Sequence, residues 1–422
     1  MNVRITGRPL GGKISAISSK SHAHRALICA ALAKTPSKII CDSVNDDIMA
    51  TASCLNAMGA QIDYHDGIFT VNPIDTGEKK GRVFMNCRES GSTLRFLLPI
   101  VCALGLEAKI DMEGRLPQRP MGELVDELIR HGAKIEQKGN SLYVGEKLCA
   151  GKFLIAGNVS SQYISGILFA MCVLKVPSSL EVIGEVQSRS YIDMTLDAIR
   201  EFGITVEEKD SLFSISGIED FTGKDLRIEG DWSNAAFWLC AGAMGGNGIC
   251  VDHLAFHSSQ GDRRIEELLA EFGANVEREN DSLTVKSAAL SGIEIDASNI
   301  PDLVPVLCAV ACAASGKTVI KNAERLRIKE SDRLEAIYDM LQSLGACFTP
   351  TKDGIIIEGN KPLKGGSVNS YNDHRMAMTA AILSTICKGE VEILEAQCVK
   401  KSYPDFWNAF NALGGHAERT RQ

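Results

Sequence analysis

A unit of about 70 residues recurs six times along the chain, and this repeat constrains the fold more than any other feature. In each unit, a segment with the apolar spacing of an amphipathic helix ends at a glycine, which suits a left-handed helix cap. These glycines are Gly59, Gly132, Gly203, Gly273, Gly345 and Gly414, in steps of 73, 71, 70, 72 and 69 residues. Most of the segments are followed by an alternating strand pair with a hairpin-turn dipeptide, such as Asp66-Gly67.

A second series of segments lies half a repeat out of phase with the first. Polar loops rich in small residues open onto almost wholly apolar helices, for example SKSHAHRALICAALA and PDLVPVLCAVACAA. A helix that is apolar on every side is a buried helix. The starts of these segments are Lys20, Ser90, Ser160, Asp231, Asp302 and Asp373, in steps of 70, 70, 71, 71 and 71 residues. Since 422 residues are too many for one core, we expect two domains, each with three buried helices.

Composition argues against several classes of protein. No apolar run approaches the roughly 18 residues that a membrane span needs, and the opening MNVRITGRPLGGKISAIS lacks a hydrophobic signal core. The net charge of −8 disfavours general binding to nucleic acids or anionic membranes. The fourteen cysteines have no disulfide-framework spacing, and the histidines have no metal-ligand spacing. We therefore expect a cytoplasmic protein with reduced thiols and no metal site.

Basic residues gather at the starts of the buried helices. A helix start concentrates unpaired N–H groups and the positive end of the helix dipole, which attracts phosphate and carboxylate. The basic residues at these starts and in nearby loops are Lys20, Arg25, Arg95, Arg119, Lys329, Arg333, Arg375 and Lys401. They are accompanied by the hydroxyl residues Ser21, Ser92, Ser160, Ser161, Ser188 and Tyr191. Because several share one phase of the repeat, a symmetric fold would bring them together, which predicts a site for anions.

Carboxylates occur at the same phase of the repeat and are candidates for acid and base. Asp302 stands before the apolar segment LVPVLCAVACAA, where loss of water is expected to raise its pKa. Glu330, in the hexapeptide IKESDR, lies beside Lys329 and one turn from Arg333. In the same hexapeptide we expect Asp332 to cap a helix or form an ion pair. The alternative for the whole chain is a repeat scaffold without catalysis, in which all these polar residues are helix caps.

Ten motifs, in order along nearly the whole chain, together resemble one family of enzymes. They are SKSHAHRALICAALA, SGSTLRFLLPI, LPQRPMGELVDEL, NVSSQYISGIL, SRSYIDMTLDA, EGDWSNAAFWL, IPDLVPVL, RIKESDRL, YNDHRMAMTAA and KKSYPDFW. On these residues the chain resembles the 5-enolpyruvylshikimate-3-phosphate synthases, which are enolpyruvyl transferases. The resemblance implies an α/β (α+β) fold with two domains, each of three βαβαββ-type repeats in a pseudo-threefold, inside-out α/β barrel. It also implies an inserted domain at 19–230, a discontinuous domain of 1–18 plus 231–422, and an active site in the cleft between them.

The resemblance implies a reaction as well. The enolpyruvyl group of phosphoenolpyruvate would move to the 5-hydroxyl of shikimate 3-phosphate through a tetrahedral intermediate, releasing phosphate, in aromatic amino acid (chorismate) biosynthesis. It implies a monomer without metal or organic cofactor, whose partners are these two small substrates.

The motifs also assign residues to the two substrates. For shikimate 3-phosphate they are Lys20, Ser21, Arg25, Ser160, Ser161, Gln162, Ser188, Tyr191, Asp302 and Lys329. For phosphoenolpyruvate they are Lys20, Gly91, Arg119, Gln162, Arg333, Arg375 and Lys401. Asp302 would accept the proton of the attacking hydroxyl, and Glu330, or alternatively Lys20, would protonate the methylene carbon.

Three positions depart from the common family pattern. Ser19 stands where glycine usually precedes Lys-Ser, and Arg325 replaces an asparagine that contacts the ring in some members. Glu89 replaces a frequent asparagine and would place a negative charge beside the phosphoenolpyruvate site unless it is paired or turned away. The nearest alternative family is UDP-N-acetylglucosamine enolpyruvyl transferase, which has a reactive cysteine before an ARPVD-like segment. Here GRLPQRPMGELVD has no such residue, because no cysteine lies between Cys102 and Cys149.

Overall fold

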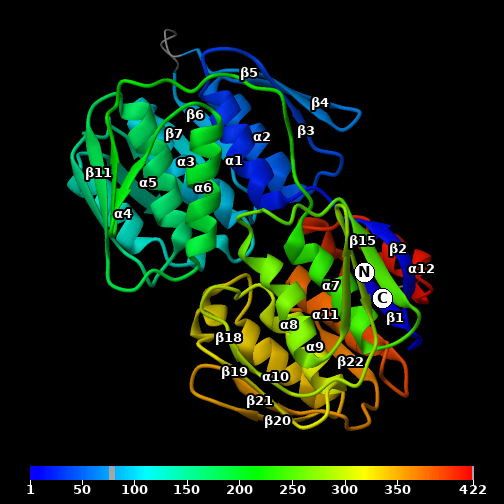
Figure 1. Cartoon of the computed structure of the whole chain (residues 1–422). Helices are drawn as coiled ribbons and strands as arrows, with labels where there is room; N and C mark the ends of the chain where they lie inside the picture. Colours follow the sequence, from blue (N-terminus) through cyan, green and yellow to red (C-terminus); the bar gives the residue numbers. More distant parts are fainter. Residues whose placement is uncertain (76–80, 421–422) are drawn as a thin grey trace. The chain divides into compact units, whose positions relative to one another are not determined.

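The computed structural model describes residues 1–75 and 81–420, and the chain divides into two compact units (Figure 1). Unit 1 consists of Met1–Ile17 and Glu229–Gln422, and unit 2 is Ser18–Ile228. Each unit has its own hydrophobic core. The family resemblance predicts that the chain crosses from one domain to the other between residues 18 and 19 and returns between residues 230 and 231.

Unit 2 contains three repeats of one arrangement. Within the described residues it has three four-stranded sheets, ordered β14-β3-β5-β4, β6-β7-β9-β8 and β10-β11-β13-β12. The first two strands of each sheet are parallel, and the remaining pairs are antiparallel. The strands are β3 (Ser37–Ile40), β4 (Gln61–His65), β5 (Ile68–Asn72), β6 (Val83–Asn86), β7 (Ala108–Asp111), β8 (Lys134–Lys138), β9 (Ser141–Gly145), β10 (Lys152–Ala156), β11 (Ser178–Ile183), β12 (Glu207–Lys209), β13 (Leu212–Ile215) and β14 (Leu226–Arg227).

Inner and outer helices alternate along unit 2. The inner helices are α1 (Lys20–Ala31), α3 (Gly91–Leu104) and α5 (Ser161–Leu174); the outer ones are α2 (Asp46–Met58), α4 (Gly122–Arg130) and α6 (Arg189–Glu201), with the short η1 (Leu116–Gln118) before α4. Most residues of the inner helices are buried, as their apolar sequences predict. Helices α3 and α5 approach closely at Gly166, where an added Cβ would lie 2.2 Å from the carbonyl oxygen of Arg95.

Unit 1 repeats the same arrangement, but its N-terminal strands complete two of the three sheets. Strand β2 pairs in parallel with β15, and β1 lies between β23 and β24 in the sheet of the last repeat. The strands are β1 (Asn2–Ile5), β2 (Gly11–Ser15), β15 (Gly248–Asp252), β16 (Asn275–Glu279), β17 (Ser282–Lys286), β18 (Glu294–Asp296), β19 (Lys317–Lys321), β20 (Cys347–Pro350), β21 (Ile355–Glu358), β22 (Gly366–Asn369), β23 (Val391–Leu394) and β24 (Ala417–Thr420). Unit 1 is therefore discontinuous because its sheets need strands from both ends of the chain.

The helices of unit 1 follow the same alternation (Figure 1). The inner ones are α7 (Trp232–Met244), α9 (Val304–Ala313) and α11 (His374–Ser384); the outer ones are α8 (Ile265–Phe272), α10 (Arg333–Ser343) and α12 (Phe406–Ala412), each preceded by a short helix, η2 (Gly261–Arg264), η3 (Glu324–Ile328) or η4 (Ala396–Lys401). The predicted repeat is thereby confirmed in both units. All six repeat glycines have positive φ, between 76° and 110°, as their predicted role at helix ends requires.

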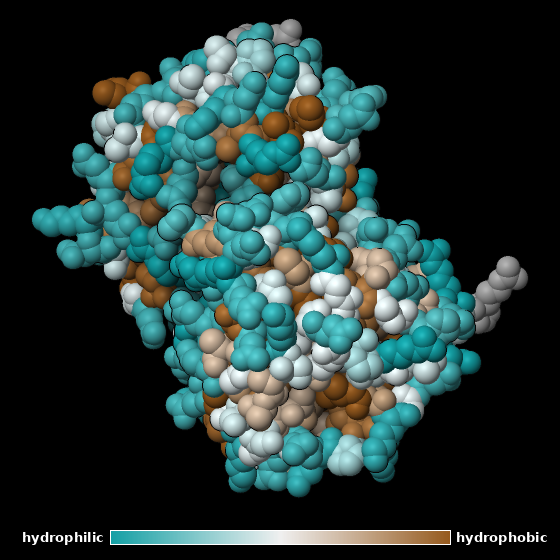
Figure 2. Space-filling model, turned by 45° about the vertical axis from the view of Figure 1, so that its right-hand side comes forward, coloured by the Kyte–Doolittle hydropathy of each residue, from teal (hydrophilic) through white to brown (hydrophobic). Residues whose placement is uncertain are grey.

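The surface and the cysteines are ordinary for a globular chain. On the face shown in Figure 2, apolar residues form separate small areas among hydrophilic ones. Within 1–75 and 81–420, no helix combines the length and apolar character of a membrane span. All fourteen cysteines are free thiols in the structure, and most are buried.

Candidate functional site

In unit 2, helix α1 holds two of the predicted basic residues, Lys20 and Arg25. Lys20 begins the helix, and its Nζ lies 3.0 Å from Oδ2 of Asp47. Ser19 caps the helix by accepting a hydrogen bond from the N–H of His22, and its φ of −62° needs no glycine. This departure from the family pattern therefore supplies a cap rather than strain.

Arg25 is a buried cation whose hydrogen bonds go to neutral groups. It donates through Nε to Thr195 Oγ1 at 2.8 Å, and through Nη1 and Nη2 to the carbonyl oxygens of Ser21 and Tyr191, both at 2.7 Å. Burial lowers the pKa of Arg25 to about 10, so the side chain stays charged at neutral pH. Its guanidinium also lies over the ring of Phe96, 5.0 Å from the centroid. A buried positive charge held by dipoles and an aromatic face, with no carboxylate among its hydrogen-bond partners, favours a nearby anion.

Two arginine side chains, Arg95 and Arg119, lie against Gly91 at the start of α3. A Cβ added to Gly91 would lie 2.8 Å from Nη1 of Arg119 and 3.1 Å from Nη1 of Arg95, so both guanidinium groups occupy the space beside the Gly91 Cα. Nη1 of Arg95 also donates to Oε1 of Gln162 at 2.7 Å, and Nε2 of Gln162 donates to Oγ of Ser92 at 2.9 Å. These bonds join the first turns of α3 and α5.

The extra negative charge of Glu89 has a defined position near this turn. A Cβ added to Gly114 would lie 2.6 Å from Oε2 of Glu89, so the carboxyl group packs on the main chain of Gly114, in the loop that leads to η1 and Arg119.

The remaining residues predicted in unit 2 lie at the starts of α5 and α6. Ser160 caps α5 by accepting from the N–H of Gln162 at 3.3 Å, and Ser161 is the first residue of the helix. Ser188 precedes α6 in the left-handed region, at φ 56°, which is a strained position for a residue with a side chain. Tyr191 follows in the first turn of α6 and accepts the bond from Arg25. We call the set Lys20, Ser21, Arg25, Gly91, Arg119, Ser160, Ser161, Gln162, Ser188 and Tyr191 the unit 2 cluster.

In unit 1, a buried arginine joins three carboxylates. Arg333, the first residue of α10, donates through Nε to Asp373 at 2.8 Å, through Nη1 to Asp302 at 2.8 Å and through Nη2 to Glu330 at 2.7 Å. Its side chain is 1% exposed and that of Asp373 is 0% exposed, whereas Asp302 and Glu330 are 17% and 25% exposed, so the site opens on the side of these two carboxylates. Asp373 also caps α11 by accepting from the N–H of Arg375. The ion pairs bring the starts of α10 and α11 and the turn before α9 together.

Asp302 is held by three cations. Its Oδ2 accepts from Arg375 at 3.0 Å, and its Oδ1 lies 2.8 Å from Arg333 and 3.5 Å from Nζ of Lys329. Burial acts to raise the pKa of Asp302, but the charges of Arg375, Lys329 and Arg333 outweigh it and hold the pKa well below its usual range. The expectation that desolvation raises this pKa is therefore wrong. The apolar helix α9 follows Asp302 as expected, but the nearby cations determine the direction in which its pKa shifts.

The other unit 1 residues lie around this carboxylate. Burial lowers the pKa of Lys329 to about 8 despite the charge of Asp302. Nζ of Lys401 donates to the carbonyl oxygen of Asn372 at 2.7 Å, which ties the end of η4 to the loop before α11. Asp332 caps α10 and pairs with Arg327, so its predicted role is confirmed. We call Asp302, Lys329, Glu330, Arg333, Arg375 and Lys401 the unit 1 cluster.

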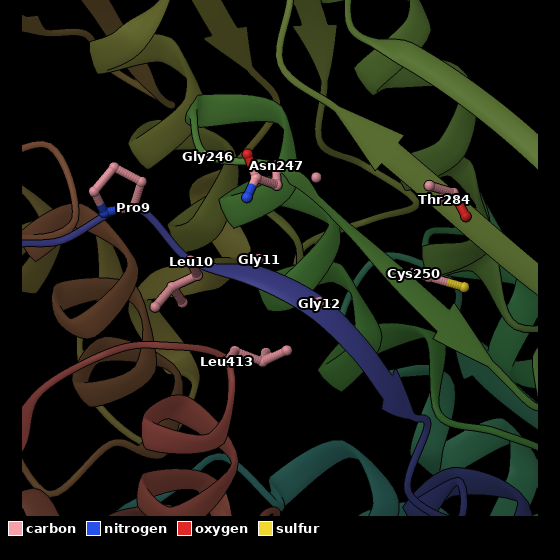
Figure 3. A pocket seen from close by; sticks show the side chains of 10 residues that line it. Pro9, Leu10, Gly11, Gly12, Gly246, Asn247, Cys250, Thr284 and Leu413 are labelled. Atoms are coloured by element: carbon pink, nitrogen blue, oxygen red, sulfur yellow. The ribbon is translucent and has the colours of Figure 1, made fainter.

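A groove in unit 1 lies outside both clusters. It has a volume of about 670 Å³ in unit 1 and runs along Gly11 and Gly12 of β2, with Cys250 of β15 and Thr284 of β17 on the other side (Figure 3). None of the predicted site residues lines it.

Comparison with known proteins decides the family. Residues 5–410 match the family model of EPSP synthase (3-phosphoshikimate 1-carboxyvinyltransferase). The chain belongs to the EPSP synthase family. It is 42% identical over 417 residues to a 3-phosphoshikimate 1-carboxyvinyltransferase of Clostridium perfringens, with 98% of each chain covered, and 41% identical over 422 residues to that of Clostridium kluyveri, with 99% and 98% covered. The EPSP synthase structure from Acinetobacter baumannii superposes with a TM-score of 0.83 at 26% identity, covering 99% of this chain and all of the other.

Membership of the EPSP synthase family confirms the predicted α/β fold class, the transferase activity and the place in aromatic amino acid biosynthesis. It also sets aside the UDP-sugar transferases and the scaffold without catalysis.

Four residues that contact the clusters were not assigned to either substrate from the sequence. Asp47 pairs with Lys20, Asp373 with Arg333, Arg95 with Gln162, and Thr195 accepts from Arg25. Arg95 was already among the basic residues of the predicted anion site, and Asp47 and Asp373 share the repeat phase of the chosen carboxylates. Thr195 carries no such signal, because it lies in the interior of an outer helix.

Proposed function

We propose that the two clusters together bind shikimate 3-phosphate and phosphoenolpyruvate and transfer the enolpyruvyl group between them. Each substrate carries a phosphate and a carboxylate, and both clusters consist mainly of cations and hydroxyl groups at helix starts. The observation that carries the proposal is Arg25, a buried cation whose bonding partners are neutral, because it leaves a positive charge to be matched by an anion.

Shikimate 3-phosphate binds chiefly to unit 2 in this proposal. Its phosphate takes hydrogen bonds from Ser160 and Ser161 at the start of α5, and its ring hydroxyls and carboxylate meet Lys20, Ser21, Arg25, Gln162, Ser188 and Tyr191. The strained backbone of Ser188 supports a binding role, since such strain persists where function requires a fixed side-chain position. From unit 1, Asp302 and Lys329 reach the hydroxyl that reacts.

Phosphoenolpyruvate takes cations from both units. In unit 2, Lys20, Arg119 and Gln162 surround the open Cα of Gly91, where a small anion can approach the N–H groups of the first turn of α3. In unit 1, Arg375, Lys401 and Arg333 complete the set. Arg375 and Arg333 are paired with carboxylates in the structure, so the substrate competes with Asp302 and its neighbours for them.

This competition gives Asp302 its basicity. While Arg375, Arg333 and Lys329 hold it, its low pKa makes it a weak base. When the anionic groups of phosphoenolpyruvate draw the arginines away and shikimate 3-phosphate engages Lys329, burial acts to raise the pKa. Asp302 then accepts the proton of the 5-hydroxyl while the hydroxyl oxygen bonds to C2 of phosphoenolpyruvate.

Glu330 donates a proton to C3 in the same step, and Lys20 is the alternative donor. The tetrahedral intermediate collapses when C3 returns that proton and the bond from C2 to the phosphate oxygen breaks. Fixed positive charge from Lys20, Arg119 and Arg375 stabilises the departing phosphate. We also propose that this enzyme acts in the cytoplasm and is a monomer. Sedimentation equilibrium would test the monomeric state.

The experiment that tests the proposal measures phosphate released from phosphoenolpyruvate. Release that requires shikimate 3-phosphate supports it. Release with UDP-N-acetylglucosamine instead, or none with either acceptor, would overturn it. The product's enolpyruvyl ether is identified by NMR, which excludes simple hydrolysis as the source of phosphate.

A further inference from the structure

A chain of buried hydrogen bonds connects α1 to the start of α3. Nδ1 of His24 lies 2.7 Å from Oγ1 of Thr51 in α2, and that oxygen lies 2.7 Å from Oγ1 of Thr93 in α3. Oγ1 of Thr93 donates to Oγ of Ser90 at 2.7 Å. All four residues are buried, with exposures of 0% or 1%. We call them the hydroxyl chain.

The acceptors around Thr93 indicate which way the protons point. Its hydroxyl has one hydrogen and two acceptors, Oγ of Ser90 at 2.7 Å and the carbonyl oxygen of Asp47 at 3.5 Å, so we infer that Thr93 accepts from Thr51. Thr51 has then used its hydrogen and accepts from His24. His24 must therefore carry its proton on Nδ1. Consistent with this, Nε2 is buried and has no hydrogen-bond partner among the described residues, because the chain runs from the other nitrogen.

The surroundings of His24 keep the ring neutral. Burial lowers its pKa well below the usual value, and the nearby charges of Lys20 and Arg25 act in the same direction. The ring of Phe96 in α3 lies nearly perpendicular to the imidazole, with the centroids 6.4 Å apart. A third positive charge beside two cations is thereby avoided, and the ring serves as a fixed donor at one atom.

The far end of the chain is the residue that caps α3. Ser90 accepts both the Thr93 hydroxyl and the Thr93 N–H, the latter at 3.2 Å, which fixes the capping turn. The next residue is Gly91, and the guanidinium groups of Arg119 and Arg95 pack beside its Cα. A shift of Ser90 would therefore move the surface on which Arg119 rests.

A second threonine makes a related bridge two repeats later. Thr195 of α6 joins Arg25 of α1 to Ser165 of α5, at 2.8 Å and 2.7 Å. Thr51 and Thr195 thus both link neighbouring inner helices from an outer one. The bridge at Thr51 differs because its donor is a neutral imidazole rather than a guanidinium.

We propose that His24 is a positioning residue, which through the hydroxyl chain sets the first turn of α3 and with it the contact between Gly91 and Arg119 that receives phosphoenolpyruvate. The inference rests on the proposed function for its kinetic consequence, but not for the hydrogen-bond chain itself. On this proposal, helix α1, which carries Lys20 and Arg25, also influences the binding of phosphoenolpyruvate through His24.

Two amide variants separate this role from simple packing. Asparagine carries Nδ2 where histidine carries Nδ1, so His24→Asn keeps a donor to Thr51. Glutamine carries its amide one bond further out, where the ring carries Nε2, so His24→Gln loses that donor. We expect His24→Gln to raise the KM for phosphoenolpyruvate about threefold to tenfold, as for the loss of one buried hydrogen bond, with the KM for shikimate 3-phosphate unchanged. His24→Asn should stay within about twofold of the parent enzyme.

Thr93→Val breaks the hydroxyl chain within α3, between Thr51 and Ser90, without altering α1. It should raise the same KM, and combining it with His24→Gln should add little, since both remove one connected path. Equal effects of asparagine and glutamine, additive effects of the two breaks, or an equal rise in the KM for shikimate 3-phosphate would each overturn the proposal.

A spectroscopic measurement tests the hydroxyl chain independently of activity. In the parent chain labelled with ¹⁵N-histidine, His24 should show a protonated Nδ1 and should not titrate between pH 6 and 8. A protonated Nε2, or titration near the usual pKa, would overturn the inference. An enzyme that released no phosphate would instead refute the proposed function and leave this readout valid.

Discussion

Replacing Gly91 with alanine tests how the start of α3 receives phosphoenolpyruvate. The new Cβ would lie 2.8 Å from Nη1 of Arg119, whereas ordinary contact begins at 3.4 Å, so the guanidinium must retreat by about 0.6 Å. The backbone at Gly91 is helical, so alanine itself introduces no strain there.

A displacement of this size is enough to lose one charged hydrogen bond to the substrate. Such bonds contribute about 1.5–3 kcal/mol, so the KM for phosphoenolpyruvate should rise roughly 10-fold to 100-fold. Because Arg119 is assigned to one substrate, the KM for shikimate 3-phosphate should change by less than about twofold. Steady-state kinetics with each substrate varied against saturating amounts of the other measure both values.

Gly122 provides a matched control, since it is also the first residue of a helix. An added Cβ there meets nothing within 4 Å. Gly122→Ala should leave both KM values at the parent level. If Gly91→Ala also left the KM for phosphoenolpyruvate unchanged, or changed both substrates equally, the assignment of Arg119 to this turn would be refuted.

Three further predictions concern the acid and base, a buried imidazole and the helix contact. Asp302→Ala and Glu330→Ala should each lower kcat by a factor of about 10² to 10⁴ while calorimetry still detects substrate binding; near-parental turnover would contradict the assigned roles. The folded-state pKa of His24 is lowered, so the unfolded chain binds more protons below about pH 6.5 and stability falls as pH decreases from there. His24→Asn should therefore reduce the loss of Tm between pH 7 and 5, and an unchanged pH profile would contradict a buried neutral imidazole. Gly166→Ala places a Cβ 2.2 Å from a carbonyl oxygen of α3 and should destabilise the protein by about 1–3 kcal/mol in urea unfolding, whereas Gly145→Ala, with open space around it, should not.

Features set by local sequence were predictable. The repeat glycines adopt positive φ, and Ser90, Ser160, Asp231 and Asp373 cap inner helices, because helix ends depend on a few adjacent residues. The apolar segments between them are buried for the equally local reason that they lack a polar face.

Features set by distant contacts were not predictable from the residues alone. The position of β1 between β23 and β24 pairs residues between 386 and 418 positions apart, and only the family resemblance pointed to a discontinuous domain. The pKa of Asp302 is likewise set by residues that are distant in the sequence. Its neighbours in sequence are apolar and favour a raised pKa. The direction is reversed by Arg375 from the next repeat and by Lys329 and Arg333, which lie 27 and 31 positions further along the chain.

A crystal structure of the Asp302→Ala variant with both substrates bound would test most directly whether the two clusters serve one reaction. We expect one phosphoenolpyruvate molecule in contact with Arg119 from unit 2 and with Arg375 and Lys401 from unit 1. Shikimate 3-phosphate should lie beside it on Lys20 and Lys329. Substrates bound away from these residues, or Arg119 and Arg375 on separate outer surfaces with no ligand in common, would contradict a shared site.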